Sequence, residues 1–168
     1  MSSLEDHLNW LNLHNEETID PERPIIDPHH HFWPGDLHYL LDDLRLDTES
    51  GHNIKKTVFI ECSQEYLEEG DQDFAPVGET IFVKKICDAA KEESQRTQIE
   101  GIVGHVNLLI GAEKLRLSSK VISKRAGLYL KEFVTQEGGI IIMNCLTHIT
   151  TLRKIYIQMR RFLRVLMN

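Results

Sequence analysis

The chain is poor in cysteine. Its 168 residues contain three cysteines, Cys62, Cys87 and Cys145, and no C-x-x-C pair. An odd number of cysteines without paired spacing indicates neither a disulfide framework nor a cysteine-ligated zinc site. Long apolar runs are also missing, so the sequence offers no candidate for a membrane span. The first twenty residues lack the basic start and apolar centre of a secretory signal, so we expect a cytoplasmic protein without a membrane partner.

The composition is that of a soluble globular domain, but the charges are unevenly distributed. Hydrophobic residues make up 41% and charged residues 27%, which excludes fibrous and wholly disordered classes. Residues 115–168 hold ten Lys or Arg and two acids, whereas residues 1–114 hold nine basic and twenty-four acidic residues. We therefore divide the chain into a polar leader at 1–23, a central segment at 24–114 and an unrelated basic tail at 115–168. We expect no nucleic-acid partner.

Short apolar runs define the expected fold. The runs at 24–32, 55–62 and 99–109 are rich in β-branched residues and predict buried strands. A helix is predicted near residues 79–93, where apolar residues recur on one face. Apolar strands alternating with helices are typical of βα units, whose parallel strands are covered on both faces. The sequence therefore predicts a parallel α/β fold.

The motif D-P-H-H-H-F-W, at the end of the first predicted strand, is the richest in chemistry. Alternation along a strand places Asp27, His29 and His31 on one face and His30 on the other. Two imidazoles on one face can bind a divalent metal such as zinc, and Asp27 is close enough to orient a ligand. The alternative is that these are turn or surface histidines, because nine histidines are scattered through the chain.

Two further residues are weaker candidates. Glu61 lies near the end of the second buried run, where a carboxylate is costly unless it is paired, so it is a possible site-lining residue. The alternative is that the strand has already reached the surface there. His105, in the third predicted strand, either faces the same site as the histidine motif or is a hydrogen-bonded core histidine.

Several linked motifs resemble a known family. In order they are I-I-D-P-H-H-H-F-W, H-Y-L-L-D-D-L, S-G-H-N-I-K-K-T-V-F-I-E-C, P-V-G-E-T and G-I-V-G-H-V-N-L. Together they resemble the amidohydrolase-related family of metal-dependent hydrolases, and within it the branch that contains the dicarboxylate lactonases. The resemblance covers residues 24–113.

This resemblance implies a (β/α)8 TIM barrel in which His29 and His31 bind a divalent metal ion, most simply zinc. It implies hydrolysis of a small lactone, amide or carboxylate substrate. The family's other ligands, a histidine about mid-barrel and an aspartate near the end, have no match here. A full barrel needs about 250 residues, so we expect a partial barrel of about three βα units. We expect a truncated hydrolase that is inactive alone, with no catalytic residue assigned.

The basic tail is interpreted as a frameshifted peptide. The reading frame can be shifted so that each new codon takes the last base of one codon and the first two bases of the next. In this frame the codons of residues 131–140 can encode G-I-R-H-x-G-G-W-D, which resembles a family segment. Residues 148–161 give a second family-like string in the same frame, and the switch falls near 114–117. The alternatives are a non-catalytic α/β interaction module, whose basic amphipathic tail binds an acidic partner or a membrane surface, and a pseudoenzyme that modulates an intact paralogue.

We predict that sequencing the genomic DNA and transcript across codons 111–131, and on past the stop, will reveal one inserted or missing base. Correcting this base is expected to restore a long barrel with further histidine and aspartate ligands. A transcript that keeps its frame and ends at Asn168 would contradict the frameshift and leave the barrel only as ancestry.

Overall fold

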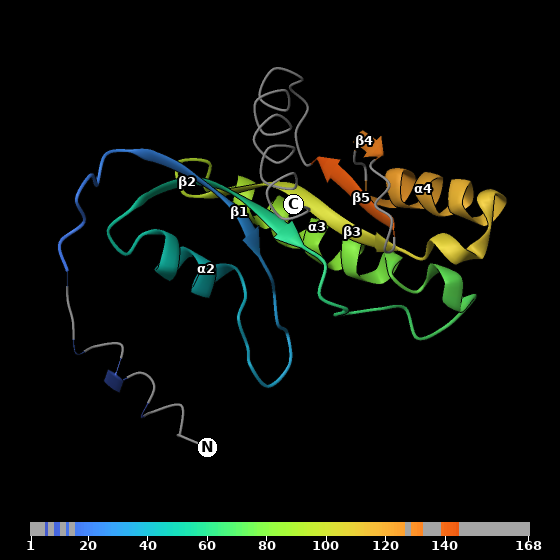
Figure 1. Cartoon of the computed structure of the whole chain (residues 1–168), viewed down its shortest axis with the longest axis horizontal. Helices are drawn as coiled ribbons and strands as arrows, with labels where there is room; N and C mark the ends of the chain where they lie inside the picture. Colours follow the sequence, from blue (N-terminus) through green and yellow to red (C-terminus); the bar gives the residue numbers. More distant parts are fainter. Residues whose placement is uncertain are drawn as a thin grey trace, which may run out of the picture.

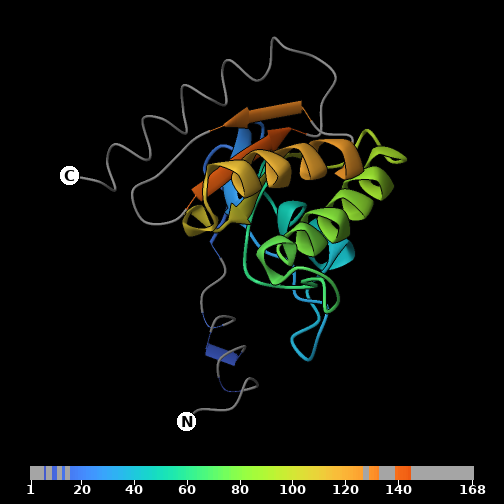
Figure 2. The same cartoon turned by 90° about the vertical axis from the view of Figure 1, so that its right-hand side faces the viewer.

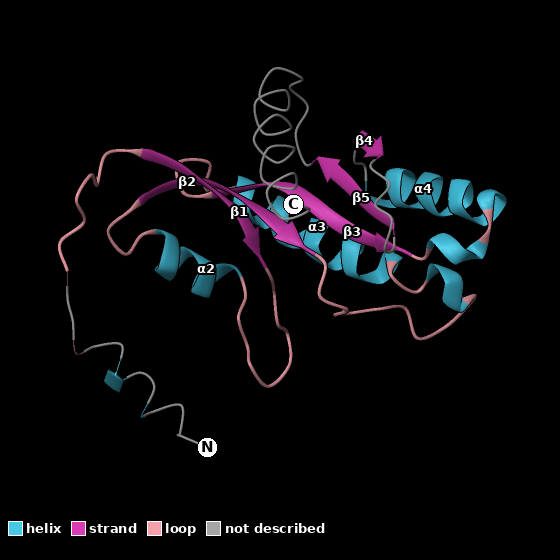
Figure 3. Cartoon of the chain, viewed as in Figure 1, coloured by secondary structure: helices cyan, strands magenta, loops and turns pink. Residues whose placement is uncertain are grey.

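A computed structural model describes residues 6, 9, 10, 13, 16–126, 129–132 and 139–144. Strands and helices alternate along the central segment (Figures 1 and 3), which confirms the α/β class. The described elements are β1 (Pro24–His30), α2 (Leu41–Thr48), β2 (Asn53–Ile60), the 3₁₀ turn η1 (Gln72–Phe74), α3 (Val77–Lys91), β3 (Gln98–Val106), the 3₁₀ turn η2 (Leu108–Ile110), α4 (Ala112–Ala126), β4 (Tyr129–Glu132) and β5 (Gly139–Asn144).

The described strands form one sheet in the order β1-β2-β3-β5-β4. The pairs β1–β2 and β2–β3 are parallel, so the carboxyl ends of these three strands lie at the same edge. By contrast, β5 pairs antiparallel with both β3 and β4. Both antiparallel strands come from the segment 115–168, which the charge distribution separates from the rest of the chain.

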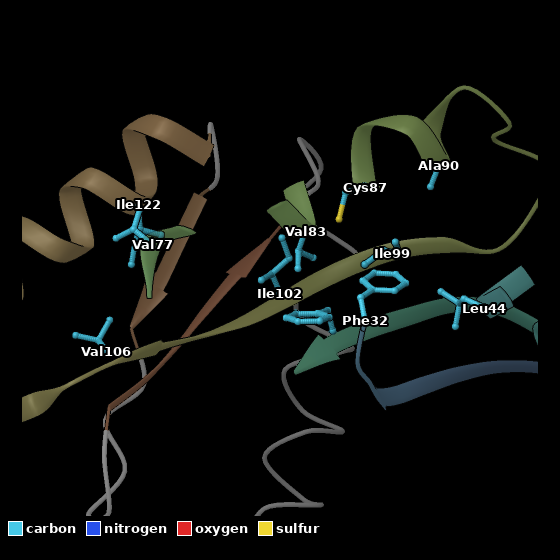
Figure 4. Packing of buried hydrophobic residues seen from close by; sticks show 11 residues of the cluster. Phe32, Leu44, Val77, Val83, Cys87, Ala90, Ile99, Ile102, Val106 and Ile122 are labelled. Carbon is cyan, nitrogen blue, oxygen red and sulfur yellow. The ribbon is translucent and has the colours of Figure 1, made fainter. Parts of the chain in front are cut away.

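A single hydrophobic cluster joins the helices to the sheet (Figure 4). Phe32 and Phe59 have no exposed surface, and their rings stack with centroids 5.7 Å apart. Burial of such a side chain contributes about 1.5–3 kcal/mol. In Figure 2, α3 and α4 cross in front of the sheet, and both contribute to this cluster. Its buried members are Phe32, Leu44, Phe59, Val77, Val83, Cys87, Ala90, Ile99, Ile102, Val106 and Ile122.

Ion pairs connect the short helix α2 and the residue after it to the turn between α3 and β3. Arg45 is 3% exposed, and its Nη1 atom donates to Glu93 at 2.6 Å. Arg96 binds both carboxylate oxygens of Glu49 at 2.7 and 2.9 Å. The buried Arg45 guanidinium is therefore paired through Nη1 alone, whereas the two-bond contact belongs to the part-exposed Arg96. These contacts fix α2 against the turn between α3 and β3.

The loop between β2 and α3 is anchored by a buried carboxylate. Glu79 lies in the first turn of α3, is 1% exposed, and accepts backbone hydrogen bonds from Cys62 at 3.0 Å and Gln64 at 2.8 Å. Burial raises the pKa of Glu79, and these two hydrogen bonds lower it in part. Ser63, between the two donors, has a φ of 61°, a conformation that costs energy outside glycine. The carboxylate therefore stabilises a strained segment directly after β2.

The charge boundary at residue 114 falls inside α4. Ile122, in the basic tail, is 1% exposed and packs in the core cluster. The predicted basic amphipathic ending, within residues 145–168, lies outside the described residues, as does about half of the leader at 1–23. None of the helices in the described ranges has the length and apolar character that crossing a membrane requires.

Gly78 allows the β2–α3 loop to approach α3 closely, and we predict that Gly78→Ala destabilises the fold. A Cβ atom at this position would lie 2.2 Å from the backbone oxygen of Glu65. The expected loss in unfolding free energy is about 2–3 kcal/mol, measured by urea denaturation. Gly35→Ala is the matched control, because a Cβ there meets nothing within 4 Å, and it should change stability by less than about 1 kcal/mol. Equal stability of the two variants would contradict this packing.

Candidate functional site

The parallel strands bring the predicted site residues to one edge of the sheet. His31 follows the end of β1, Glu61 follows the end of β2, and His105 lies near the end of β3. The backbone amide of Glu61 donates to Val103 at 2.8 Å, which continues the pairing of β2 with β3 to this edge. Carboxyl ends of parallel strands are where α/β folds place their binding and catalytic groups.

His29 and His31 are the most closely paired of these residues. Their Nε2 atoms lie 3.2 Å apart, and the Nδ1 atom of His31 lies 2.8 Å from the backbone oxygen of Ile60. Because a carbonyl oxygen only accepts, Nδ1 of His31 is the donor, and in a neutral ring this leaves the lone pair on Nε2. With Zn–N bonds of about 2.0–2.1 Å, a 3.2 Å separation corresponds to an N–Zn–N angle of about 100°, close to tetrahedral. The geometry therefore suits two ligands of one zinc ion.

Asp27 acts on the backbone of this motif. Its Oδ1 atom accepts a hydrogen bond from the backbone N–H of His29 at 3.0 Å. The register of β1 against β2 shifts between Asp27 and His30, which interrupts the strict alternation that predicts a shared face for Asp27, His29 and His31. Asp27 is consequently placed to fix the chain at His29, and the structure gives no hydrogen bond from it to an imidazole ring.

His30 is the buried member of the three consecutive histidines. It is 8% exposed, and its Nε2 atom lies 3.1 Å from the Thr57 hydroxyl oxygen. The pKa of His30 is lowered to about 4, chiefly by burial and to a smaller extent by the charges of His31 and His29. His30 is therefore a neutral imidazole near pH 7, and it belongs to the packing between β1 and β2.

Glu61 and His105 form a second pair at the same edge. The Oε1 atom of Glu61 lies 3.8 Å from Nδ1 of His105, and each side chain is about one third exposed. A carboxylate beside an imidazole can orient the ring and stabilise its protonated form. Cys62, next in sequence, is not activated, because burial and the charge of Glu79 raise the pKa of its thiol to about 12.

A pocket of about 540 Å³ opens beside β1. It contains three residues that the sequence singles out, Asp27, His29 and His31, and it excludes Glu61. The pocket also contains the Tyr39 hydroxyl, which donates to Asp47 at 2.6 Å and which sequence patterns do not identify as a site residue. The motif H-Y-L-L-D-D-L is the one sequence feature that includes Tyr39. The lining residues are Asp27, His29, His30, His31, Trp33, Leu37, Tyr39, Leu44, Asp47, Thr48 and Ile54.

The metal-ligand set is incomplete within the part of the chain that the structure describes. No group of three or more His, Cys, Asp or Glu side chains in those ranges is arranged to hold a metal ion. Comparison with protein-family models, with curated proteins and with solved structures finds no match to the chain. The function proposed for it therefore depends on its residues and their geometry.

The buried imidazole of His30 should make stability depend on pH. Its pKa is lower in the folded state than the ordinary value of 6.5, so the unfolded chain binds more protons between pH 6.5 and 4. The unfolding free energy should therefore fall as the pH falls through this window, by up to about 1.4 kcal/mol per pH unit. Urea denaturation in EDTA at pH 7, 6 and 5 measures this slope. His30→Gln should have a shallower slope over the same range, and an unchanged slope would contradict the assignment.

Proposed function

We propose that the chain is the amino-terminal part of a metal-dependent hydrolase of the amidohydrolase-related family. In this proposal β1, β2 and β3 are the first three strands of a (β/α)8 barrel. Their parallel pairing and the helices between them support it. The antiparallel β5 departs from an all-parallel barrel, but it lies in the segment interpreted as frameshifted. The intact form would act on a small lactone, amide or carboxylate.

The observation that carries the proposal is the convergence of two imidazoles at the carboxyl edge of parallel strands. The Nε2 atoms of His29 and His31 lie 3.2 Å apart, and the backbone oxygen of Ile60 lies 2.8 Å from Nδ1 of His31. An outer hydrogen bond of this kind is typical of histidines that ligate metals. Zinc is the ion that such a pair most simply binds, with its remaining positions filled by water or by groups outside the described residues.

Each residue then has a distinct role in the proposed site. When bound, a zinc ion supplies hydroxide near neutral pH by lowering the pKa of its water. His29 and His31 would hold the ion, and Asp27 would hold the backbone of His29 in place. Glu61 and His105, paired at 3.8 Å, would accept or return a proton at the same edge. In the absence of the later ligands, the expected activity of the chain alone is negligible.

The test is metal binding by the full chain. Protein stripped with EDTA and titrated with ZnCl₂ in a calorimeter should bind one ion per chain, and elemental analysis should recover that ion after desalting. His29→Ala combined with His31→Ala should weaken binding at least tenfold, because it removes both ligands of the described pair.

His52→Ala is the matched control for this test. His52 is an exposed histidine in the turn before β2, so its loss should leave zinc binding unchanged. Zinc content that is the same in the double variant, the control and the unaltered chain would overturn the proposal. Loss of binding in the control alone would place the metal elsewhere and overturn it equally.

A further inference from the structure

The pocket beside β1 has an aromatic wall built by a hairpin. The loop at residues 33–39 connects β1 toward α2 (Figure 1), and Trp33 and Tyr39 exchange two backbone hydrogen bonds of 2.9 Å across its base. Both aromatic residues line the pocket, and Leu44 of α2 adds an apolar side chain. Leu37 at the rim is 76% exposed. The pocket is therefore open, and the rings of Trp33 and Tyr39 are part of its largely apolar lining.

The polar part of the same pocket is acidic. Asp27 and Asp47 line it, and none of the described lining residues is Lys or Arg. The pKa of the Tyr39 hydroxyl is raised first by burial, then by its hydrogen bond to Asp47, and further by the charges of Asp47, Asp43 and Asp27. The carboxylates of Asp47, Asp43 and Asp27 therefore all act on the Tyr39 hydroxyl. The negative potential that they create favours positively charged ligands.

One buried group in the pocket has no assigned partner. His30 lines the pocket and is 8% exposed, and its Nδ1 atom makes no hydrogen bond within the described structure. A buried polar atom without a partner is costly, and a ligand that supplies or orders a partner relieves that cost.

We propose that this pocket binds an organic cation, an amine or quaternary ammonium group carried on an aromatic body. The ammonium group lies between Asp47 and Asp27 and against the faces of Trp33 and Tyr39, and the aromatic body packs toward Leu44. Carboxylates and aromatic rings together attract such groups by Coulomb and cation–π interactions. The site does not depend on a metal at His29 and His31. A divalent ion there would add positive charge and weaken the cation's binding.

The test uses the fluorescence of Trp33 in the full chain. The sequence has two tryptophans, so Trp10→Phe leaves Trp33 as the sole reporter. Titration with benzyltrimethylammonium should change the emission saturably, and benzyl alcohol and benzoate should bind at least fivefold more weakly. Equal binding of the neutral alcohol would mean an apolar slot without charge preference, and tighter binding of benzoate would mean an anion site. Either result overturns the proposal.

Variants and metal-free protein separate this site from the metal proposal. Asp47→Asn keeps an acceptor for Tyr39 but removes the charge, and it should weaken benzyltrimethylammonium about fivefold or more. Asp36→Asn, an exposed residue of the same loop that does not line the pocket, should have little effect. His29 and His31 both line the pocket, so the two proposals are separated without altering them: the unaltered chain stripped of zinc with EDTA should still bind benzyltrimethylammonium. Equal effects of Asp47→Asn and Asp36→Asn would overturn the proposal. If Asp47→Asn fails to fold by circular dichroism, the ligand series on the unaltered pocket decides.

Discussion

The parallel alignment of β1, β2 and β3 is the constraint on which the rest of the structure depends. It places His31, Glu61 and His105 at one edge, and hydrogen bonds of 2.8 Å from His31 to Ile60 and from Glu61 to Val103 continue across the strand ends. The buried rings beneath β1 and β2 keep this register. A slip of one residue in β1 would reverse the faces of three consecutive histidines, burying the paired imidazoles and exposing His30.

The strands are the part of the fold that a sequence predicts well, because parallel strands are continuous apolar runs. The predicted strand at 24–32 ends at His30, since the chain then leaves the sheet toward the hairpin of Trp33 and Tyr39. The eight-residue helix α2 could not be predicted from periodicity, because it is short and largely polar. Its main tether, from Arg45 to Glu93, joins residues 48 positions apart, a contact that no local pattern shows.

The candidate site likewise has features that the sequence predicts and features that depend on residues far apart in the chain. The H-x-H spacing alone predicts that His29 and His31 share a face, because alternation is a local property of a strand. The register shift at Pro28 is not local, since it depends on β2 as well, and it leaves Asp27 on a backbone amide. Glu79 was missed for a similar reason, because its partners are amides 15 and 17 residues away. Sequence patterns therefore give the histidine pair but not the carboxylates that hold the backbone around it and after β2.

The same carboxylates of the pocket would attract both a metal ion and an organic cation, so the binding of the two proposed ligands is coupled electrostatically. Asp27 and Asp47 line the pocket, and their charges would stabilise a metal ion or an ammonium group bound there. Coupling between two ligands is reciprocal, so a cation that binds the metal-free pocket more tightly must weaken the metal by the same factor. The described lining holds no Lys or Arg to meet a carboxylate substrate. In the proposed hydrolase, the metal itself would therefore supply the positive charge that such a substrate requires.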